Sequence, residues 1–472
     1  MAEERPIDRF NLGSSESLSI YSLAPTPGHR ASPGLPEIVD DADSITPTPP
    51  LRLNVPPNPF NTSPLGTSSN SSAVQLHQQR QSQKYFRSRR IKKGEAPQSW
   101  KTKKDPREKW VTIIPLIGLA LGFALAGFLV YDGLQSVVHH NYKLVLDEDW
   151  SGGFNTDVWL KEAQVGGYGN GLFDQTTDTD ENVYVKDGKL YIKPTLQNET
   201  LITTNTNLSL GASCTGTTFY DCNAVTNTTN GTIVPPVKSG RITTRNGPTI
   251  KYGRIEVSAT LPSGDWLWPA IWLLPLNSTY GPWPASGEID IAEARGNNYT
   301  YPQGGNNIIS SALHWGPDTK DDAFWRTNNK LSALHTTFAA KEHTFGVEWS
   351  EKYIFTYVDT RLMQVLYNPF TAEGLWARGQ FPLSLSNGTT ITDPWVDGGF
   401  NAPFDQEFYL ILNVAVGATN GWFQDGAGGK PWVDNSLTAK KDFWDARDQW
   451  LPTWGDGAQM VVSKVQMWQQ LD

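Results

Sequence analysis

The longest uninterrupted apolar stretch of the chain is VTIIPLIGLALGFALAGFLV at residues 111–130, which carries no charge over 20 positions. About 20 apolar residues are what a helix needs to cross the hydrocarbon of a bilayer. Trp110 and Tyr131 flank the stretch, where amphipathic aromatic side chains favour the two membrane interfaces. A signal peptide would be shorter and nearer the N-terminus, and a soluble core helix would not be apolar on every face. The pattern predicts a transmembrane helix over residues 110–131.

Beyond residue 144 the apolar positions follow the period of two that is typical of β-strands. Residues 182–194 alternate on both sides of Asp187-Gly188, a dipeptide favoured in tight hairpin turns. Residues 407–417 are almost all apolar, as expected of a central strand covered on both faces. Similar alternation marks residues 252–260, 344–358 and 460–468. The pattern predicts an all-β sandwich of two antiparallel sheets over residues 144–472.

Composition separates the segment before the apolar stretch from the rest of the chain. Fourteen of the 32 prolines lie before residue 110, whereas 17 of the 19 tryptophans lie after it. A segment rich in Pro and Ser and poor in aromatics cannot bury enough apolar surface to offset the entropy of ordering. We therefore expect residues 1–109 to be a disordered tail. The formal net charge of −9 argues against a nucleic-acid partner.

The charges on the two flanks of the span predict its orientation. Eleven Lys and Arg residues lie between Lys84 and Lys109, whereas residues 131–150 contain only Lys143. The positive-inside rule then places the tail in the cytoplasm and the large domain in the lumen or outside the cell, as a single-pass type II membrane protein. A nuclear localisation or nucleic-acid patch is the alternative explanation of the basic run. Its position directly before the span favours the membrane explanation.

Glycosylation motifs and cysteines agree with this orientation. Asn-x-Ser/Thr motifs occur after the span at Asn198, Asn207, Asn227, Asn230, Asn277, Asn298 and Asn387. The Ser-rich tail contains two more, at Asn61 and Asn70. The two cysteines, Cys214 and Cys222, lie in a polar stretch at 197–233 that we expect to be a glycosylated surface insertion. In an oxidising compartment they predict a disulfide; a metal site is the weaker alternative, because two thiols without nearby histidines are too few ligands.

Residues 283–298 (WPASGEIDIAEARGNN) hold the pattern that indicates chemistry. In a strand, Glu288 and Asp290 share one face because they are two residues apart, and Glu293 would point to the other face. One bulge residue near Ala292 would correct the phase and bring all three acids together. Two carboxyl groups about 5–5.5 Å apart are what a retaining glycosidase needs, one as nucleophile and one as acid/base. Asp290 between them would hold their pKa values apart.

Alternating acids and isoleucines also occur on an ordinary solvent-exposed strand, so the neighbouring aromatics decide between the two interpretations. Aromatic rings suit the apolar faces of sugars, and an indole N–H can bond a hydroxyl group. Core packing is the alternative role for each ring, and for Trp272 it is nearly as good an explanation as a place in the cleft. The residues predicted to contact substrate are Trp268, Trp283, His314 and Trp315.

In these stretches the sequence resembles glycoside hydrolase family 16, in particular its laminarinase and β-1,3-glucan-recognition branch. The matching segments are GRITTRNGPTIKYGRIEVSATLP, WPAIWLLP, WPASGEIDIAEARGN, SSALHWGP, HTFGVEWS and LNVAVG, which together span about residues 144–470. The Glu-x-Asp-x-x-Glu hexapeptide is similar to the bulged form of the family's acidic motif. A departure is Gly417-Ala418, where the family more often has two glycines.

The resemblance implies a concanavalin-like jelly roll and a retaining mechanism. By it, Glu288 is the nucleophile, Glu293 the acid/base and Asp290 the assisting carboxylate. It implies no required cofactor; some members carry a structural calcium ion, whose ligands the sequence does not identify. The membrane span is similar to the architecture of fungal type II proteins of β-1,6-glucan assembly.

Three functions follow as hypotheses. The first is an endo-acting hydrolase of β-1,3-glucan or mixed β-1,3/1,4-glucan, or a transglycosylase in cell-wall remodelling. The second is a non-catalytic β-1,3-glucan-binding protein. The third is a β-1,6-glucan assembly factor whose acids matter only for folding. The presence of all three acids, Glu288, Asp290 and Glu293, favours the enzyme.

Overall fold

The computed structural model describes residues 88–99, 105–136, 139–382, 384 and 390–472. The chain forms two separate units, residues 1–137 and residues 138–472. The predicted tail lies almost entirely outside the described residues, as does Asn387. In the first unit, helix α2 covers Glu108–Ser136 and is long and apolar enough to cross a membrane. Its side chains from residue 108 to residue 133 are exposed all round, as a helix surrounded by lipid would require.

The second unit is built on two large antiparallel sheets. In spatial order the first contains β18 (Gln364–Pro369), β17 (Tyr353–Val358), β16 (His343–Trp349), β11 (Gly253–Thr260), β20 (Met460–Gln470), β5 (Lys189–Ile192) and β4 (Val183–Lys186), with β1 (Tyr142–Glu148) also paired to β20. The second contains β15 (Asn328–Ser332), β14 (Ile308–His314), β13 (Glu288–Ala294), β12 (Leu267–Pro275), β19 (Phe408–Val416), β10 (Arg241–Thr243) and β2 (Leu160–Lys161). The predicted all-β jelly-roll sandwich is confirmed.

The sequence pattern explains how the sheets face each other. Along β11 buried and half-buried residues alternate without interruption, and Ile255 and Val257 enter the core between the sheets. All nine residues of β19 are buried, because β12 and β10 flank it and both of its faces are covered. Asp187 and Gly188 have φ angles of 52° and 67°, so the hairpin between β4 and β5 turns where the sequence predicts.

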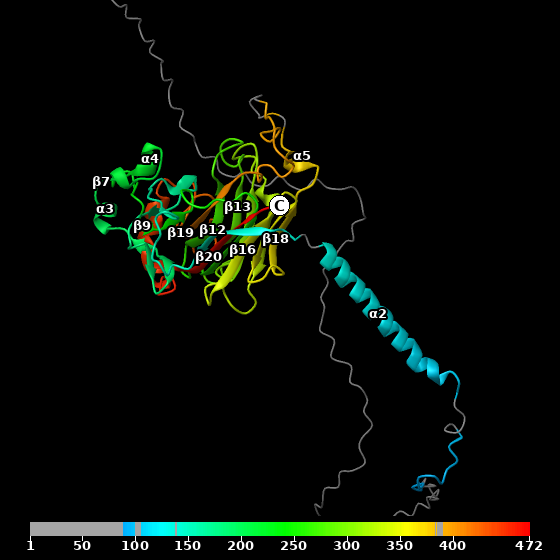
Figure 1. Ribbon diagram of the computed structural model, residues 1–472. Helices are drawn as coiled ribbons and strands as arrows, with labels where there is room; N and C mark the ends of the chain where they lie inside the picture. Colours follow the sequence, from blue (N-terminus) through cyan, green and yellow to red (C-terminus); the bar gives the residue numbers. More distant parts are fainter. Residues whose placement is uncertain (1–87, 100–104, 137–138, 383, 385–389) are drawn as a thin grey trace, which may run out of the picture. The chain divides into compact units, whose positions relative to one another are not determined.

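The polar stretch at 197–233 folds into a small unit of its own at one side of the sandwich, where Figure 1 shows α3, β7 and α4 together. It contains α3 (Glu199–Thr203), η2 (Gly211–Ser213), α4 (Phe219–Cys222) and the two-stranded sheet of β7 (Thr206–Ser209) and β8 (Asn223–Thr226). A disulfide joins Cys214 to Cys222, as the sequence predicts. A separate apolar cluster of Ile202, Ile233, Val234 and Trp444 anchors the insertion to the domain.

The remaining elements connect or cover these layers. They are η1 (Gly167–Gly169), β3 (Asp174–Thr176), β6 (Thr195–Leu196), β9 (Val237–Ser239), η3 (Phe324–Arg326), α5 (Gly374–Gly379), α6 (Ala439–Asp445), α7 (Arg447–Trp450) and η4 (Leu451–Thr453). Strands β3, β9 and β6 form a three-stranded sheet, within which β3 and β9 run parallel.

Candidate active site

The three acids lie on β13, and a bulge in this strand sets their direction. Against β14, Asp290 pairs with Ala312 and Glu293 with Ser310, so β13 has one more residue than its partner between these two pairs. Against β12 the shift falls between the pairs of Ala292 and Asp290. The extra residue restores the phase, and Glu288, Asp290 and Glu293 line the same cleft. The bulge predicted near Ala292 is confirmed.

Each of the two glutamates accepts a hydrogen bond from a different indole. Trp283 Nε1 donates to Glu288 Oε2 at 2.7 Å, and Trp268 Nε1 donates to Glu293 Oε1 at 2.9 Å. Both glutamates are half-buried, whereas Asp290 is 2% exposed. The indoles therefore fix the direction of both glutamate side chains before any ligand is present.

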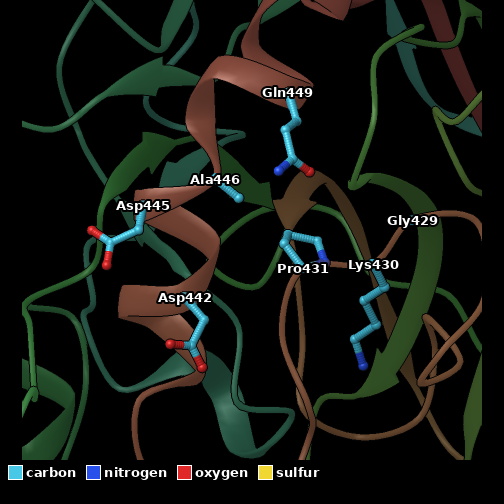
Figure 2. Close-up of a pocket in the computed structure, with 7 residues that line it drawn as sticks. All are labelled: Gly429, Lys430, Pro431, Asp442, Asp445, Ala446 and Gln449. Carbon is cyan, nitrogen blue, oxygen red and sulfur yellow. The ribbon is translucent and has the colours of Figure 1, made fainter.

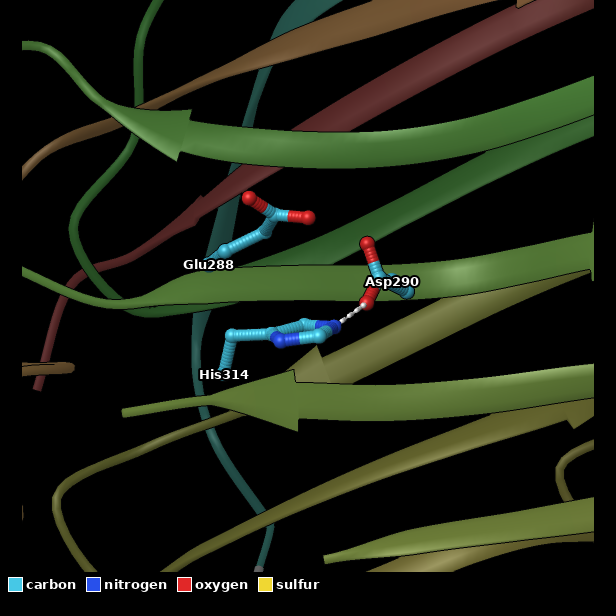
Figure 3. Close-up of side chains that lie close together, drawn as sticks. All are labelled: Glu288, Asp290 and His314. Carbon is cyan, nitrogen blue, oxygen red and sulfur yellow. Dashed lines mark ion pairs between the residues drawn. The ribbon is translucent and has the colours of Figure 1, made fainter. Parts of the chain in front are cut away.

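His314, at the end of β14, lies beside the acids. Its Nε2 is 3.2 Å from Asp290 Oδ2, the ion pair drawn as a dashed line in Figure 3. Its Nδ1 is 2.6 Å from Asp322 Oδ2, on the loop that follows the strand. Hydrogen bonds to Asp290 and Asp322, and the charges of Asp290 and Glu288, outweigh burial and raise the pKa of His314 well above its usual value. The ring is therefore an imidazolium cation at neutral pH.

Burial and mutual repulsion raise the pKa values of both glutamates. For Glu293, desolvation and then the negative charge of Asp290 raise the pKa to about 8. For Glu288 the same two causes raise the pKa well above the usual value. The positive charge of His314 acts in the opposite direction on both groups. At neutral pH the cluster therefore holds at least one proton on a carboxyl group.

Among the described residues, Glu288, Asp290 and His314 form the single group of three potential metal ligands, with their ligand atoms within 4.8 Å of one another. A metal would need a lone pair on one imidazole nitrogen. Here each ring nitrogen faces a carboxylate oxygen, which is the arrangement of a ring protonated at both positions. With a proton on each nitrogen, the ring offers no lone pair to a metal ion.

Other residues also line the cleft, and of the four described here only Trp272 was considered for it from the sequence. Arg241 forms an ion pair with Glu162 at 2.6 Å, and its guanidinium carbon lies 4.1 Å from the ring centre of Tyr168 and 4.7 Å from that of Trp272. Trp272 Nε1 donates to Asn413 Oδ1 at 2.7 Å. Arg241, Tyr168, Trp272 and Asn413 all line the cleft with the acids. They belong to η1, β10, β12 and β19, so spacing alone gave no signal for Arg241 and Tyr168.

The structure separates the four residues predicted to contact substrate. Trp268 lines the cleft with the acids, and Trp283, 41% exposed, and His314 contact them directly. The prediction for Trp315 is wrong. This side chain is fully buried, its indole donates to Thr327, and it packs against Trp395 in the core. Trp315 follows His314 directly, so the alternation of side chains turns it to the opposite face.

The glycosylation motifs lie on the surface wherever they are described. The asparagines at 198, 207, 227, 230, 277 and 298 are all exposed. Sugar chains could therefore be attached to all six without disturbing the core.

A larger open hollow lies away from the acids, between α6, α7 and residues 429–431 (Figure 2). Its lining includes Lys430, Asp442, Asp445 and Gln449. Lys430 is already satisfied, because its ammonium group binds the carbonyl of Phe423 and the carboxylates of Asp425 and Asp434. Its two acids are also already partnered, because Asp442 accepts a hydrogen bond from Thr438 and Asp445 pairs with Lys441, so the cleft over β13 is the stronger candidate for a site.

The second unit is an all-β jelly roll of antiparallel sheets with three acids lining one cleft. The profile of Glycosyl hydrolases family 16 matches residues 192–395. The Beta-1,3-glucan-binding protein of Penaeus monodon is 40% identical over 359 residues, which cover 72% of this chain and 94% of that protein. The chain belongs to glycosyl hydrolase family 16.

Two further similarities are more distant. Glucan endo-1,3-beta-glucosidase A1 of Niallia circulans is 33% identical over 256 residues, which cover 53% of this chain and 29% of that protein. The solved laminarinase from Rhodothermus marinus is 24% identical and has a TM-score of 0.44, with 71% of this chain and all of that chain covered.

Proposed function

We propose that the second unit is a retaining endo-β-glucanase that acts on β-1,3-glucan or mixed β-1,3/1,4-glucan. The observation that carries the proposal is the bulge in β13, which turns Glu293 to the face of Glu288. Family membership and a relative named as a glucan endo-1,3-beta-glucosidase support the substrate class. The residues that carry out the reaction are Glu288 as nucleophile, Glu293 as acid/base and Asp290 as the assisting carboxylate.

The proposed reaction has two steps. Glu288 attacks the anomeric carbon while Glu293 gives its proton to the leaving glycosidic oxygen, which forms a glycosyl ester on Glu288. Glu293, now ionised, then removes a proton from water or from a sugar hydroxyl group, which displaces Glu288. Water gives hydrolysis and a sugar acceptor gives transglycosylation. The chemistry needs no cofactor, and a structural calcium ion remains an expectation from the family resemblance.

The proposed reaction starts with Glu293 protonated and Glu288 ionised. A pKa of about 8 keeps Glu293 protonated at neutral pH, ready to act as an acid. On each glutamate an indole N–H and the cation of His314 favour the ionised form, against the burial that raises both pKa values. The negative charge of Asp290 raises the pKa of both glutamates, and that of Glu293 also raises the pKa of Glu288. Loss of a proton from Glu293 therefore favours a proton on Glu288.

The test is to replace Glu288 by Gln, which keeps the shape of the side chain but cannot attack. We expect release of reducing ends from laminarin to fall by roughly 10⁴-fold while laminarin binding and the melting temperature change little. Glu407→Gln is the matched control, because Glu407 is an exposed carboxylate outside the cleft. Equal rates for wild type and Glu288→Gln would refute the proposal. Product analysis on laminarin, lichenan and pustulan would define the linkage.

A second function, glucan binding without cleavage, is favoured by the printed name of the Penaeus monodon relative. It uses the same cleft, with the acids and aromatic side chains serving as hydrogen-bonding and stacking groups. Wild-type protein that binds laminarin but releases no reducing ends, with or without an acceptor sugar, would establish it. A wall-assembly factor would instead show a lowered melting temperature in Glu288→Gln and Glu293→Gln.

We propose that α2 crosses a membrane, with the tail in the cytoplasm and the glucan-binding domain on the other side. The length of α2 and its exposed apolar side chains support the span. The basic residues before it and the exposed glycosylation motifs after it support the orientation. Such a tethered form would suit remodelling of glucan at a cell wall.

A further inference from the structure

A fourth carboxylate, that of Asp322, contacts His314 at the ring nitrogen that does not face Asp290. Asp322 lies on the loop between β14 and η3, and its side chain is 9% exposed. Its Oδ1 accepts backbone hydrogen bonds from Trp315 at 3.3 Å and from Phe324 at 3.1 Å. Its Oδ2 is left to face Nδ1 of His314 at 2.6 Å. The two backbone donors therefore hold the carboxylate in a fixed direction under the ring.

Two aromatic rings and two carboxylates contact the imidazole ring of His314. Phe324 of η3 stacks on its face, with ring centres 5.0 Å apart and planes 18° apart, and Trp283 lies at 5.6 Å. Its Nε2 faces Asp290 Oδ2 at 3.2 Å. The charged groups that interact with the ring are Asp290, Glu288 and Glu293 from β13 and Asp322 from the loop. A lone pair on either nitrogen would point at a carboxylate oxygen, so both nitrogens carry protons.

We propose that Asp322 is a positioning residue that holds His314 as a cation beside Glu288 and Asp290, and that this loop thereby regulates the charge of the acid cluster. The effect on turnover rests on the function proposed above. The effect on the ring does not, because it concerns only the protonation of His314.

The consequence for the acids has a definite sign. The positive charge of His314 lowers the pKa values of Glu288 and Glu293 against the burial that raises them. If the ring becomes neutral, both pKa values rise further. In the two-carboxylate mechanism the acidic limb of the pH–rate profile reports the nucleophile and the alkaline limb reports the acid. Both limbs should therefore move to higher pH together.

The test is Asp322→Asn, which keeps the Oδ1 acceptor for both backbone donors and replaces Oδ2 by an amide. The amide can donate to Nδ1, so the ring stays in place as a neutral imidazole with its Nε2 proton still directed at Asp290. By NMR titration we expect the pKa of His314 to fall by about one to three units. Its resonances are assigned by their absence in His314→Gln.

Asp318→Asn is the matched control, because it makes the same change in the same loop. Asp318 caps the backbone N–H groups of Lys320 and Asp321. It should leave the His314 titration and the pH–rate profile unchanged. Asp322→Glu, which restores the charge, should recover part of the His314 shift.

The outcomes separate the two proposals. An unchanged His314 titration in Asp322→Asn overturns this inference, whether or not the protein cleaves glucan. A changed titration with an unmoved pH–rate profile also overturns it, since the loop would then not regulate the acids. Wild-type protein that cleaves no glucan while the titration shifts as expected refutes the enzymatic proposal and leaves the role of Asp322 in holding the ring.

Discussion

Two tryptophans hold the glutamates of the cleft through their indole N–H groups. Trp268 in turn stacks on Trp422, with ring centres 4.5 Å apart. The guanidinium carbon of Arg295 lies 4.0 Å from the ring centre of Trp422. The guanidinium of Arg295 also donates to the carbonyl oxygen of Trp422. Glu293 is thus oriented by a column of packed side chains whose last member is a buried arginine. The position of the proposed acid therefore depends on residues that do not contact it.

Trp268→Phe tests this support. The variant keeps an aromatic ring on Trp422 but loses the N–H group, which stabilises the ionised form of Glu293. The pKa of Glu293 should rise above about 8, so the alkaline limb of the pH–rate profile moves to higher pH. Loss of a hydrogen bond to a charged group should also lower the rate by roughly 10-fold. Trp454→Phe is the control, because that indole bonds the backbone carbonyl of Asp265 outside the cleft.

At the residue scale, the sequence predicts the acids correctly, because the spacing of residues along a strand sets the face on which each side chain lies. Glu288 and Asp290 share a face by strand periodicity, and the spacing of Glu293 demands a bulge. Trp315 was wrongly predicted to contact substrate, because an aromatic next to His314 suits a cleft and a core equally well until the strand direction is known. Arg241 was missed because its burial in the cleft depends on the ion pair with Glu162, a contact between distant parts of the sequence.

At the scale of the element, the bulge in β13 is an insertion of one residue into an otherwise regular ladder. Asp290 pairs with Trp272 and Ala312, and Glu293 pairs with Ala270 and Ser310. Both neighbouring strands have a single residue between these positions. A β13 shortened by one residue here could therefore keep both flanking pairs in register.

Deletion of Ala292 should accordingly give a folded protein. The remaining Ile291 would sit between Asp290 and Glu293 and keep its buried direction, so Glu293 would still face the cleft. We expect a melting temperature lowered by the loss of one buried methyl group, about 1 kcal/mol of unfolding free energy, and measurable release of reducing ends. Circular dichroism and the laminarin assay check the two expectations.

Deletion of Ile289 is the contrasting change on the same strand. Ile289 lies in the regular part of the ladder, paired with Leu273 and Leu313. Its removal would turn Glu288 towards the core and should abolish activity. If the two deletions behaved alike, the phase argument for the three acids would be wrong.

At the scale of the whole molecule, the sequence predicts the separation of span and sandwich because the span is uninterrupted apolar sequence, whereas the strands of the sandwich alternate with a period of two. The predicted surface insertion is richer than expected, since residues 197–233 contain a disulfide, two short helices, two strands and an apolar contact to Trp444. Polar composition concealed this order, because the buried residues are few and scattered. The far contact with Trp444 cannot be read from local pattern.

The proposed orientation can be tested with the glycosylation motifs on both sides of α2. If the second unit enters the secretory lumen, its exposed asparagines should carry glycans, whereas Asn61 and Asn70 in the tail should not, because the transferring enzyme works only in the lumen. Digestion of the full chain with an N-glycosidase should therefore lower its mass. The double variant Asn61→Gln, Asn70→Gln should lose the same mass on digestion as the wild type. Replacing the Lys and Arg residues between 84 and 109 by Gln removes the charge bias and should lower the glycosylated fraction. Glycans on the tail, or a mass that the enzyme does not change, would show that the chain is not oriented as proposed.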